Sequence, residues 1–473
     1  MPTQQTIRYQ RRLPIRYDVD VFVAGGGPAG MAAAVTAARG GASVYLAEAH
    51  VCFGGMGTAG MLPIFMPFGD RRNFCADGFG REVLGRLRSA GGMAPGVGEN
   101  ELAPRIRCEA LKRVYDDLAA DARFQFTFQT AFLDVQREGD RVACAICASK
   151  SGTFAVRARV FIDATGDGDL CARAGAPFEK GDASGTLQPG TLVSLWTDID
   201  WSRAESNGHG IWRQESDLPR AFADKVFTIE DNHLPGIIPV GPHTGGGNVG
   251  HAFGVDGTDD RSLTKAILWA RKSLVEYERY YREYLTGYEQ AWLAATASLF
   301  GVRETRRITG DYVLSADDYA SLATFDDEIG RYNYWIDIHP SSADKKDFAD
   351  HVKWRTSPMK EGESYGIPYR TLTPRGLRNV LTAGRCVSTD HVVQASLRVM
   401  PGCYITGQAA GLAAALAARA GGGDVRAIDV RDLQRRLKAV GAFLPNFAER
   451  PSTIGPVVTP ETLEPGKKVG EER

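Results

Sequence analysis

A glycine-rich turn near the amino terminus constrains the fold of this chain more than any other feature. The turn reads GGGPAG over residues 25–30 and follows the apolar run 19–24. An alanine-rich stretch, 31–38, and a second apolar run, 43–47, come directly after it. The order strand, tight turn, helix, strand is the one that a dinucleotide-binding unit requires. The sequence therefore predicts such a unit at the start of the chain.

Each glycine of the GxGxxG pattern in this turn has its own expected role. Gly25 permits the turn, Gly27 lets the backbone approach a pyrophosphate, and Gly30 lets the helix pack on the strand. The first turn of the helix then offers free N–H groups and a positive dipole end to the phosphates. Glu48 follows Gly30 by 18 residues and closes the second strand. A carboxylate there accepts both ribose hydroxyls and repels a 2′-phosphate, so the sequence disfavours NADP.

Composition narrows the class of protein. A chain of 473 residues is too long for one small core, so we expect two domains or one large interleaved pair. Its 43% apolar and 24% charged residues are typical of a soluble globular protein. A net charge of −1 shows no excess of basic residues, so the composition does not indicate nucleic-acid binding. No run of about 18 apolar residues predicts a membrane span, and residues 1–16 lack the apolar core of a signal peptide, which favours a cytoplasmic location.

Local patterns divide the remaining chain into two regions with different predicted secondary structure. The first part predicts alternating helices and strands: helices at 76–90 and 107–120, and strands at 124–128, 131–136, 141–148, 153–157 and 160–162. The middle part shows no βαβ rhythm and predicts helices at 262–285 and 290–298. A buried strand at 379–383 and a small-residue helix at 404–418 follow, and the composition after Pro451 predicts a disordered tail.

Four separated motifs carry a family resemblance. They are the opening turn with Glu48, GGMGT over 54–58, VFIDATGDG over 160–168, and LTAGR over 381–385 with QAAG downstream at 408–411. In this combination the chain resembles the FAD-dependent oxidoreductases of the glutathione-reductase-like superfamily. The resemblance is closest to the branch of the fumarate reductase and succinate dehydrogenase flavoproteins and their uncharacterised bacterial relatives.

The resemblance implies an α/β fold with a Rossmann-like, ββα-type FAD-binding domain that is split in sequence by an inserted α+β substrate domain. The expected boundaries are 17–180 and 370–445 for the two parts of the FAD domain, 181–369 for the insertion and 446–473 for a tail.

The resemblance also implies which residues hold FAD. Those residues come from both ends of the chain: Gly25, Gly27, Pro28, Ala29, Gly30, Glu48, Ala49, Gly54, Gly55, Met56, Gly57, Thr58, Phe132, Ala164, Thr165, Gly166, Gly384 and Arg385. One position departs from the family pattern, which often has an acid where this chain has Arg385. A positive charge there can pair with the pyrophosphate instead.

A proline-containing helix start, 400–404, is expected beside the flavin. Reduced flavin is negative around N1 and the C2 carbonyl, and a helix N-terminus stabilises such charge. We hypothesise that the backbone N–H groups of Gly402, Cys403 and Tyr404 face the flavin pyrimidine.

Candidate catalytic residues lie just before this helix. Arg398 matches the position of an arginine that binds a substrate carboxylate in the fumarate reductase branch, and its alternative roles are a structural ion pair or a flavin contact. His391 precedes it by seven residues and is a candidate general base, with a structural role as the alternative.

Candidate substrate residues come from the middle of the chain. A glycine-rich loop over 243–251 carries His243, Asn248 and His251, and it either approaches a ligand or forms a flexible surface loop. The spacing of eight between its histidines fits no standard zinc motif, so no metal is expected. If the segment around them is helical, Arg303 and Arg307 lie on the same face of the helix. That face is either a salt-bridged surface, an anchor between domains or a second site for substrate anions.

The predicted function is that of an FAD-dependent oxidoreductase. FAD would exchange two electrons, as a hydride at flavin N5, with a small polar or anionic molecule, most simply as a dehydrogenase or oxidase. The alternatives are an NAD(P)H-fed monooxygenase, an alkene reductase and a flavoprotein without catalysis. Clustered cysteines for iron–sulfur ligation and the CxxxxC of disulfide reductases are missing from the sequence. The electron donor or acceptor and the oligomeric state stay open.

Overall fold

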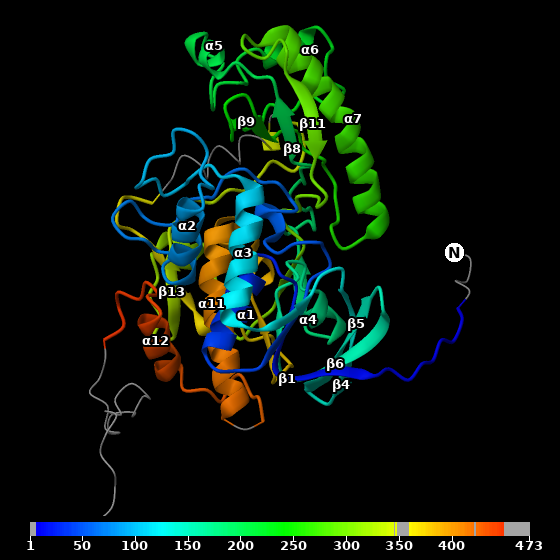
Figure 1. Ribbon diagram of the computed structural model, residues 1–473, viewed down its shortest axis with the longest axis vertical. Helices are drawn as coiled ribbons and strands as arrows, with labels where there is room; N and C mark the ends of the chain where they lie inside the picture. Colours follow the sequence, from blue (N-terminus) through cyan, green and yellow to red (C-terminus); the bar gives the residue numbers. More distant parts are fainter. Residues whose placement is uncertain (1–5, 345, 348–358, 421, 449–473) are drawn as a thin grey trace, which may run out of the picture.

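The structure is a computed structural model that describes residues 6–344, 346–347, 359–420 and 422–448. Figure 1 shows two bodies: a main body that holds the largest sheet and the helices α1 (Pro28–Arg39) and α11 (Met400–Arg419), and a cap above it that holds the long helix α7 (Asp260–Tyr284). The tail predicted at 446–473 lies outside the described residues from 449 onward.

A seven-stranded sheet forms the centre of the main body. Its order is β3-β2-β1-β6-β5-β4, and β15 also pairs with β6. β1 is parallel to β2 and β6, while β5 is antiparallel to both β4 and β6. The strands are β1 (Ile15–Ala24), β2 (Val44–Ala47), β3 (Gln125–Thr127), β4 (Ala131–Glu138), β5 (Arg141–Ser149), β6 (Gly152–Asp163) and β15 (Val380–Thr382).

This sheet confirms the predicted Rossmann-like α/β fold. The residues of β1 from Val21 to Ala24 are fully buried, as expected for a parallel strand that is covered on both faces. The two strands predicted at 153–157 and 160–162 form one strand, β6, because its first half pairs with β5 and its second half with β15.

Helices from the two ends of the chain pack side by side on this sheet. α1 (Pro28–Arg39) contacts α11 (Met400–Arg419) along most of its length. The contact depends on small residues, because a Cβ on Gly407 would lie 2.3 Å from the Ala29 carbonyl oxygen and one on Gly411 would lie 2.2 Å from that of Ala33. The Thr36 hydroxyl also donates to the Gln408 carbonyl at 3.1 Å. The alanine- and glycine-rich composition of both helices is therefore a packing requirement.

The cap is built on a four-stranded antiparallel sheet of order β11-β8-β10-β9. The long helix α7 (Asp260–Tyr284) lies along it, and large aromatic side chains such as Trp196 and Tyr281 fill the space between them. The strands are β8 (Ser194–Thr197), β9 (Gly236–Pro239), β10 (Gly245–Asn248) and β11 (Trp292–Thr296).

Two expectations for the cap are wrong. The helix predicted at 290–298 is the strand β11, because this segment pairs with β8 at the edge of the sheet. The predicted glycine-rich loop contains the central strand β10, where neighbouring side chains occupy the space of the missing Cβ atoms. A Cβ on Gly245 would lie 2.2 Å from a methyl carbon of Ile237, and one on Gly247 would lie 2.6 Å from the Trp196 indole nitrogen.

The remaining elements surround these two sheets. The helices predicted at 76–90 and 107–120 are α2 and α3, with ends that differ by at most three residues. Most of the other elements are short. They are η1 (Gly55–Gly57), α2 (Phe79–Ser89), α3 (Cys108–Ala122), α4 (Asp169–Arg173), β7 (Phe178–Lys180), α5 (Trp201–Ser206), α6 (Leu218–Ala223), β12 (Arg306–Ile308), α8 (Ala316–Ala320), β13 (Glu328–Tyr332), β14 (Tyr365–Pro368), η2 (Tyr369–Thr371), η3 (Gly384–Cys386), α10 (His391–Leu397) and α12 (Val430–Ala439).

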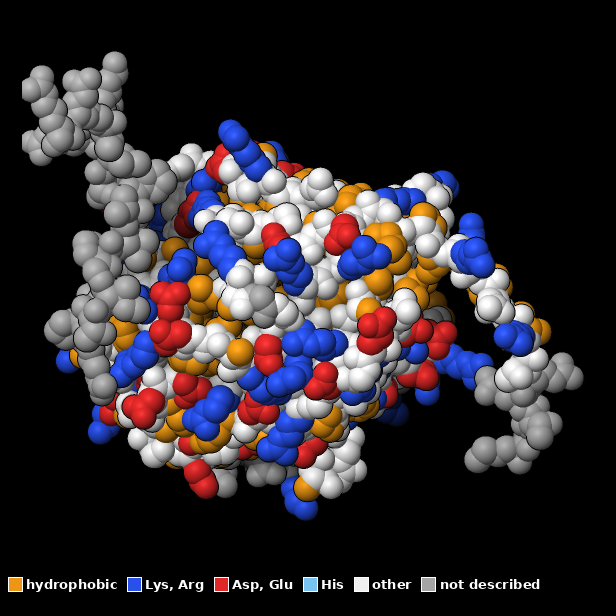
Figure 2. Space-filling model, turned by 90° about the horizontal axis from the view of Figure 1, so that it is seen from below, with side chains coloured by type: hydrophobic (Ala, Val, Ile, Leu, Met, Phe, Trp, Pro, Cys, Tyr) orange, Lys and Arg blue, Asp and Glu red, His pale blue; other side chains and the backbone are white. Residues whose placement is uncertain are grey.

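The surface carries mixed charge. On the face drawn in Figure 2, basic and acidic side chains alternate over most of the area. Among the helices that the structure describes, none has the length and apolar character needed to span a bilayer.

Candidate functional site

The glycine turn between β1 and α1 forms a cradle at the edge of the sheet. Gly25 has a φ of +93°, and a Cβ there would lie 2.6 Å from the Ala164 carbonyl oxygen. A Cβ on Gly30 would lie 1.9 Å from the Gly25 carbonyl oxygen, so the helix can start only with glycine at this place. Gly27, by contrast, faces open space. The three positions thus have the turn, approach and packing geometry of a pyrophosphate site.

Glu48 is held rigidly at the end of β2. It is 5% exposed, and its two oxygens accept hydrogen bonds from the backbone N–H groups of Gly26 (2.6 Å) and His50 (2.7 Å). A carboxylate has about four acceptor positions, so two remain for ribose hydroxyls. The acid is therefore preorganised for the role that its spacing predicts.

A cavity of about 560 Å³ starts at this cradle and continues between the main body and the cap. It brings together residues from the whole length of the chain. The predicted site residues that line it are Gly25, Gly27, Pro28, Ala29, Glu48, Ala49, Gly55, Met56, Phe132, Ala164, Thr165, Gly166, Asn248, Arg303, Gly384, Arg385, Arg398 and Cys403.

Other predicted residues lie behind this wall. Gly54 has a φ of +98° and packs on Thr58, whose hydroxyl donates to the Phe53 carbonyl. A Cβ on Gly57 would lie 2.8 Å from the sulfur of Met400. These residues shape the turn after β2 and support the residues that face the cavity.

The start of α11 differs in detail from the hypothesis. The Cys403 N–H donates to the Val399 carbonyl at 2.9 Å, and the Tyr404 side chain is hydrogen-bonded to the Tyr115 hydroxyl in the core. Met400 and Gly402 lie in the first turn of α11, where backbone N–H groups have no acceptor within the helix. These two amides, unlike that of Cys403, have no acceptor within the helix, and of the two residues Met400 lines the cavity.

The cradle end of the cavity fits a dinucleotide in three independent ways. α1 has no side-chain cap, so its first amides are open to an anion. Arg385 donates to Asp167 at 2.8 Å, yet its other terminal nitrogen, Nη1, is buried without a hydrogen-bond partner among the described residues. Gly384 lies against the start of α1, since a Cβ there would be 2.8 Å from that of Ala29. A guanidinium nitrogen without a hydrogen-bond partner among the described residues, free amides and open space at Gly27 together suit a pyrophosphate.

Two guanidinium groups stand in the other part of the cavity wall. Arg303 is 8% exposed and donates to the Pro189 carbonyl (2.8 Å) and the Thr191 hydroxyl (3.0 Å). Burial, and then repulsion from Arg398, lowers its pKa to about 9, so it is still a cation at neutral pH. Arg398 donates to the Asp337 carbonyl oxygen at 2.9 Å.

Asp337 also lines the cavity and is ionised. Burial alone raises the pKa of this carboxyl, but His339 and the two guanidinium groups outweigh burial and hold the pKa well below its usual range. This part of the wall therefore combines two cations with one anion.

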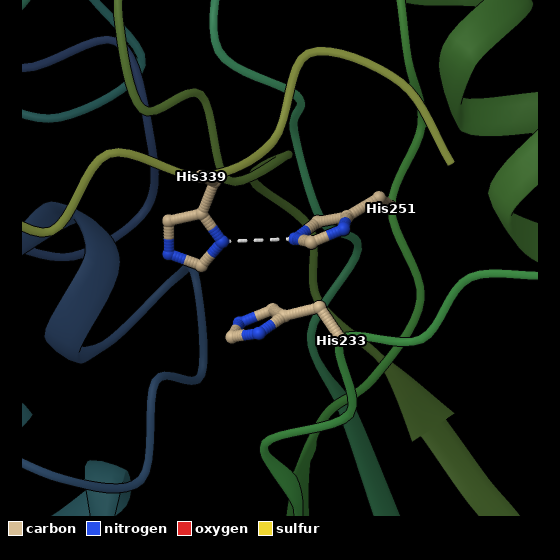
Figure 3. Close-up of side chains that lie close together, drawn as sticks. All are labelled: His233, His251 and His339. Atoms are coloured by element: carbon tan, nitrogen blue, oxygen red, sulfur yellow. Dashed lines mark hydrogen bonds between the residues drawn. The ribbon is translucent and has the colours of Figure 1, made fainter. Parts of the chain in front are cut away.

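Three histidines meet beside these arginines, as Figure 3 shows. His233, His251 and His339 are each less than a tenth exposed, and their ligand nitrogens lie within 4.8 Å of one another. Burial lowers the pKa of His251 and His339, against the opposing effect of Asp231 and Asp337, so both rings are neutral. His233 and His339 were missed by the sequence analysis, because separations of 18 and 88 residues from His251 match no motif.

The other predicted histidines lie elsewhere. His391, at the start of α10, contacts Glu304 at 2.9 Å and is not among the described residues that line the cavity. Glu304 is fully buried and also pairs with Arg307, so Arg303 and Arg307 point to different partners and share no helical face. His243 contacts the Ile199 carbonyl at 3.2 Å in the cap.

Comparison with known proteins identifies one family and several solved structures with partial similarity. The model of a family described as FAD dependent oxidoreductase matches residues 20–437. No curated protein matches the chain. Among solved structures, a geranylgeranyl bacteriochlorophyll reductase-like protein from Thermoplasma acidophilum is 13% identical, with a TM-score of 0.44, over 90% of this chain and 83% of the other.

Two further structures show a similar overlap. A myxobacterial chondrochloren halogenase is 13% identical with a TM-score of 0.42, over 89% of this chain and 78% of the other. A p-nitrophenol 4-monooxygenase from Pseudomonas putida is 12% identical with a TM-score of 0.39, over 89% and 81%.

Proposed function

The chain belongs to the FAD-dependent oxidoreductase family, and from this premise we propose that it transfers two electrons between FAD and a small anionic organic substrate held by Arg303 and Arg398. Bound FAD supplies the electron-accepting and electron-donating chemistry. The residues of the chain supply binding, orientation and charge.

Arg303 is the observation that carries this proposal. It is buried in the wall of the cavity, and its described hydrogen bonds go to two neutral oxygens. Burial and then the charge of Arg398 lower its pKa more than Asp337 and Asp231 raise it, so the charged guanidinium is only partly compensated. A substrate carboxylate would supply the missing anion and gain charge-assisted hydrogen bonds in a site with little water.

The position of the cradle supports a substrate site at the other end of the cavity. Gly27, Glu48 and Arg385 would hold the pyrophosphate and ribose of FAD, which leaves the far part of the same cavity for the flavin and the substrate. There the first amides of α11 would face the flavin, and Arg398 precedes this helix by two residues. His391 stays a predicted base. It begins the short helix α10, whose end leads directly into Arg398.

Anion binding provides the first test. Succinate is titrated into the purified holoprotein, and the visible absorbance of bound FAD reports binding; succinamide, the neutral analogue, is the matched ligand. We expect saturable binding of succinate only, weakened roughly 10- to 150-fold by Arg303→Gln, since a hydrogen bond to a charged group contributes about 1.5–3 kcal/mol.

Two variants complete this test. Arg303→Lys keeps the charge and should retain part of the affinity, which separates charge from folding. Arg279→Gln removes an exposed arginine of α7, paired with Glu283 at 3.0 Å, and should bind succinate as the wild type does. Equal binding of succinate by the wild type and Arg303→Gln would contradict the proposal.

The direction of electron flow needs a second measurement. The proposed dehydrogenase or oxidase takes electrons from its organic substrate, so NADH and NADPH should leave the oxidised flavin spectrum unchanged under anaerobic conditions. Rapid bleaching would instead favour the NAD(P)H-fed monooxygenase or alkene reductase. The narrower resemblance to the fumarate reductase branch stays a prediction.

A further inference from the structure

We propose that His233, His251 and His339 bind one divalent transition-metal ion of the zinc type beside the cavity. The three rings come from separate segments of the cap and of the chain that returns to the main body. In Figure 3 the rings of His251 and His339 face each other, and the ring of His233 lies beside them, parallel to that of His251. This inference goes beyond the proposed oxidoreductase function and does not rest on it.

The distances suit a metal. The ligand nitrogens lie within 4.8 Å of one another, and His251 Nε2 is 2.9 Å from His339 Nδ1. In a tetrahedral site with metal–nitrogen distances of about 2.1 Å, ligand nitrogens are about 3.4 Å apart. Small rotations of side chains therefore convert the observed cluster into a three-nitrogen site.

Two carboxylates orient the rings from outside. His251 Nδ1 lies 2.9 Å from an oxygen of Asp231, and His339 Nε2 lies 3.5 Å from an oxygen of Asp337. Metal-binding histidines usually give their second ring nitrogen to a carboxylate, which fixes the tautomer and raises the basicity of the ligand nitrogen. Asp231 stands at the distance for this role, although His251 Nδ1 and the facing oxygen are not aligned as a hydrogen bond among the described residues.

The same arrangement favours a cation between the rings. A neutral imidazole has one N–H group and one lone pair. If both rings give their N–H group to the outer carboxylates, the lone pairs of His251 Nε2 and His339 Nδ1 face each other at 2.9 Å. A metal ion at the centre turns this repulsion into two coordinate bonds.

The donor set and the charge indicate the kind of metal. Three imidazole nitrogens without a thiolate suit Zn²⁺ and leave a fourth position open. Asp231 and Asp337 offset the charge of Arg303 and Arg398, so a bound divalent ion would leave the site positive. Since His339 and Asp337 line the cavity, the fourth ligand would be hydroxide or an anionic oxygen from the cavity.

Zinc titration tests this proposal. The purified holoprotein is treated with EDTA, desalted and titrated with Zn²⁺ in competition with a chromophoric chelator. We expect one tightly bound equivalent in the wild type and at least a tenfold weaker affinity in His251→Gln and His233→Gln. Asp231→Asn keeps all three imidazoles and should weaken binding by about 10- to 100-fold.

His209→Gln is the matched control. His209 also forms a histidine–aspartate pair, with Asp217 at 3.3 Å, but it lies outside the cluster. FAD content and circular dichroism report folding, and Asp231→Asn carries the test if the histidine variants do not fold. The proposal is overturned if the wild type takes no Zn²⁺ from the chelator, as expected when a proton bridges the rings, or if His209→Gln loses as much affinity as the cluster variants.

Discussion

Single residues of the glycine turn differ in what surrounds them, and this difference separates folding from cofactor binding. A Cβ on Gly27 meets no atom within 4 Å, whereas one on Gly30 would lie 1.9 Å from the Gly25 carbonyl oxygen. Gly27 lines the cavity, so the space beside it is open to a ligand, whereas the space beside Gly30 is filled by the backbone.

We therefore expect opposite results from two alanine substitutions. Gly27→Ala should leave the unfolding free energy of the apoprotein within about 0.5 kcal/mol and weaken FAD binding at least about tenfold, because its methyl group enters the space of the pyrophosphate. Gly30→Ala should destabilise the apoprotein itself by about 1–3 kcal/mol. Urea unfolding of the apoprotein and titration with FAD measure both effects. Unweakened FAD binding by Gly27→Ala would place the pyrophosphate elsewhere.

Residues of this kind could be predicted because their signal is local. Gly25, Gly30 and Glu48 act within one strand–turn–helix–strand unit, so their spacing along the chain fixes their geometry. His233 and His339 meet His251 only through the fold of the cap, and Arg303 reaches the cavity only because its segment is not helical. Nothing in the sequence near these residues signals such contacts.

Helices and strands show the same contrast between signals that are local in the sequence and contacts that only the fold creates. The helix α11 was predicted from its small residues, which the contact with α1 requires, whereas β10 and β11 were not predicted as strands. A run of three glycines has no intrinsic preference for a strand. It becomes one in this protein because Trp196, Ile237 and Pro63 occupy the positions where side chains would stand.

The α1–α11 contact can be tested with two glycine-to-alanine substitutions in helices. Gly411→Ala should destabilise the protein by about 1–3 kcal/mol, because its Cβ would lie 2.2 Å from the Ala33 carbonyl oxygen. Gly85→Ala, in the exposed part of α2 with no atom within 4 Å, should stabilise it by about 0.5–1 kcal/mol. Urea denaturation compares them. A loss of stability in both variants would indicate that glycine serves helix flexibility rather than close packing.

The link between α1 and α2 predicts a pH dependence. Glu82 accepts two hydrogen bonds from Arg39, at 2.6 and 2.9 Å, and also pairs with Arg86. Burial raises the pKa of this carboxyl, but the two arginines outweigh burial and lower it below 4.5. A lowered carboxyl pKa stabilises the fold above the unfolded pKa, and this stabilisation is lost as the pH falls through the folded pKa.

Glu82→Gln should therefore lower the free energy of unfolding by about 0.5–1 kcal/mol at pH 7. The difference from the wild type should stay constant down to about pH 5 and shrink below about pH 4.5, where the unfolded carboxyl begins to protonate. Urea denaturation at several pH values measures it. A difference that grows toward acid would assign the effect to another group.

The whole molecule joins segments that are far apart in the sequence around one cavity. The cradle comes from residues 25–30, the adjoining wall from 384–385, and the far wall from 298–303 and 337–339. The main body was predictable because its motifs mark the ends of its strands. The position of the cap over the cradle was not, since it depends on packing between the bodies.

Hydrogen exchange of the whole protein tests this arrangement. FAD should slow exchange at 25–30, 384–386 and 298–303 together, because one ligand would contact all three segments. Succinate, added after FAD, should further protect 298–303 and 337–339 and leave 25–30 unchanged, since the proposed anion site lies at the far wall. The amides of α6, outside the cavity lining, serve as the internal control. If succinate protects the cradle instead, Arg385 and the helix N-terminus are its site, and the division of the cavity into a cofactor end and a substrate end is wrong.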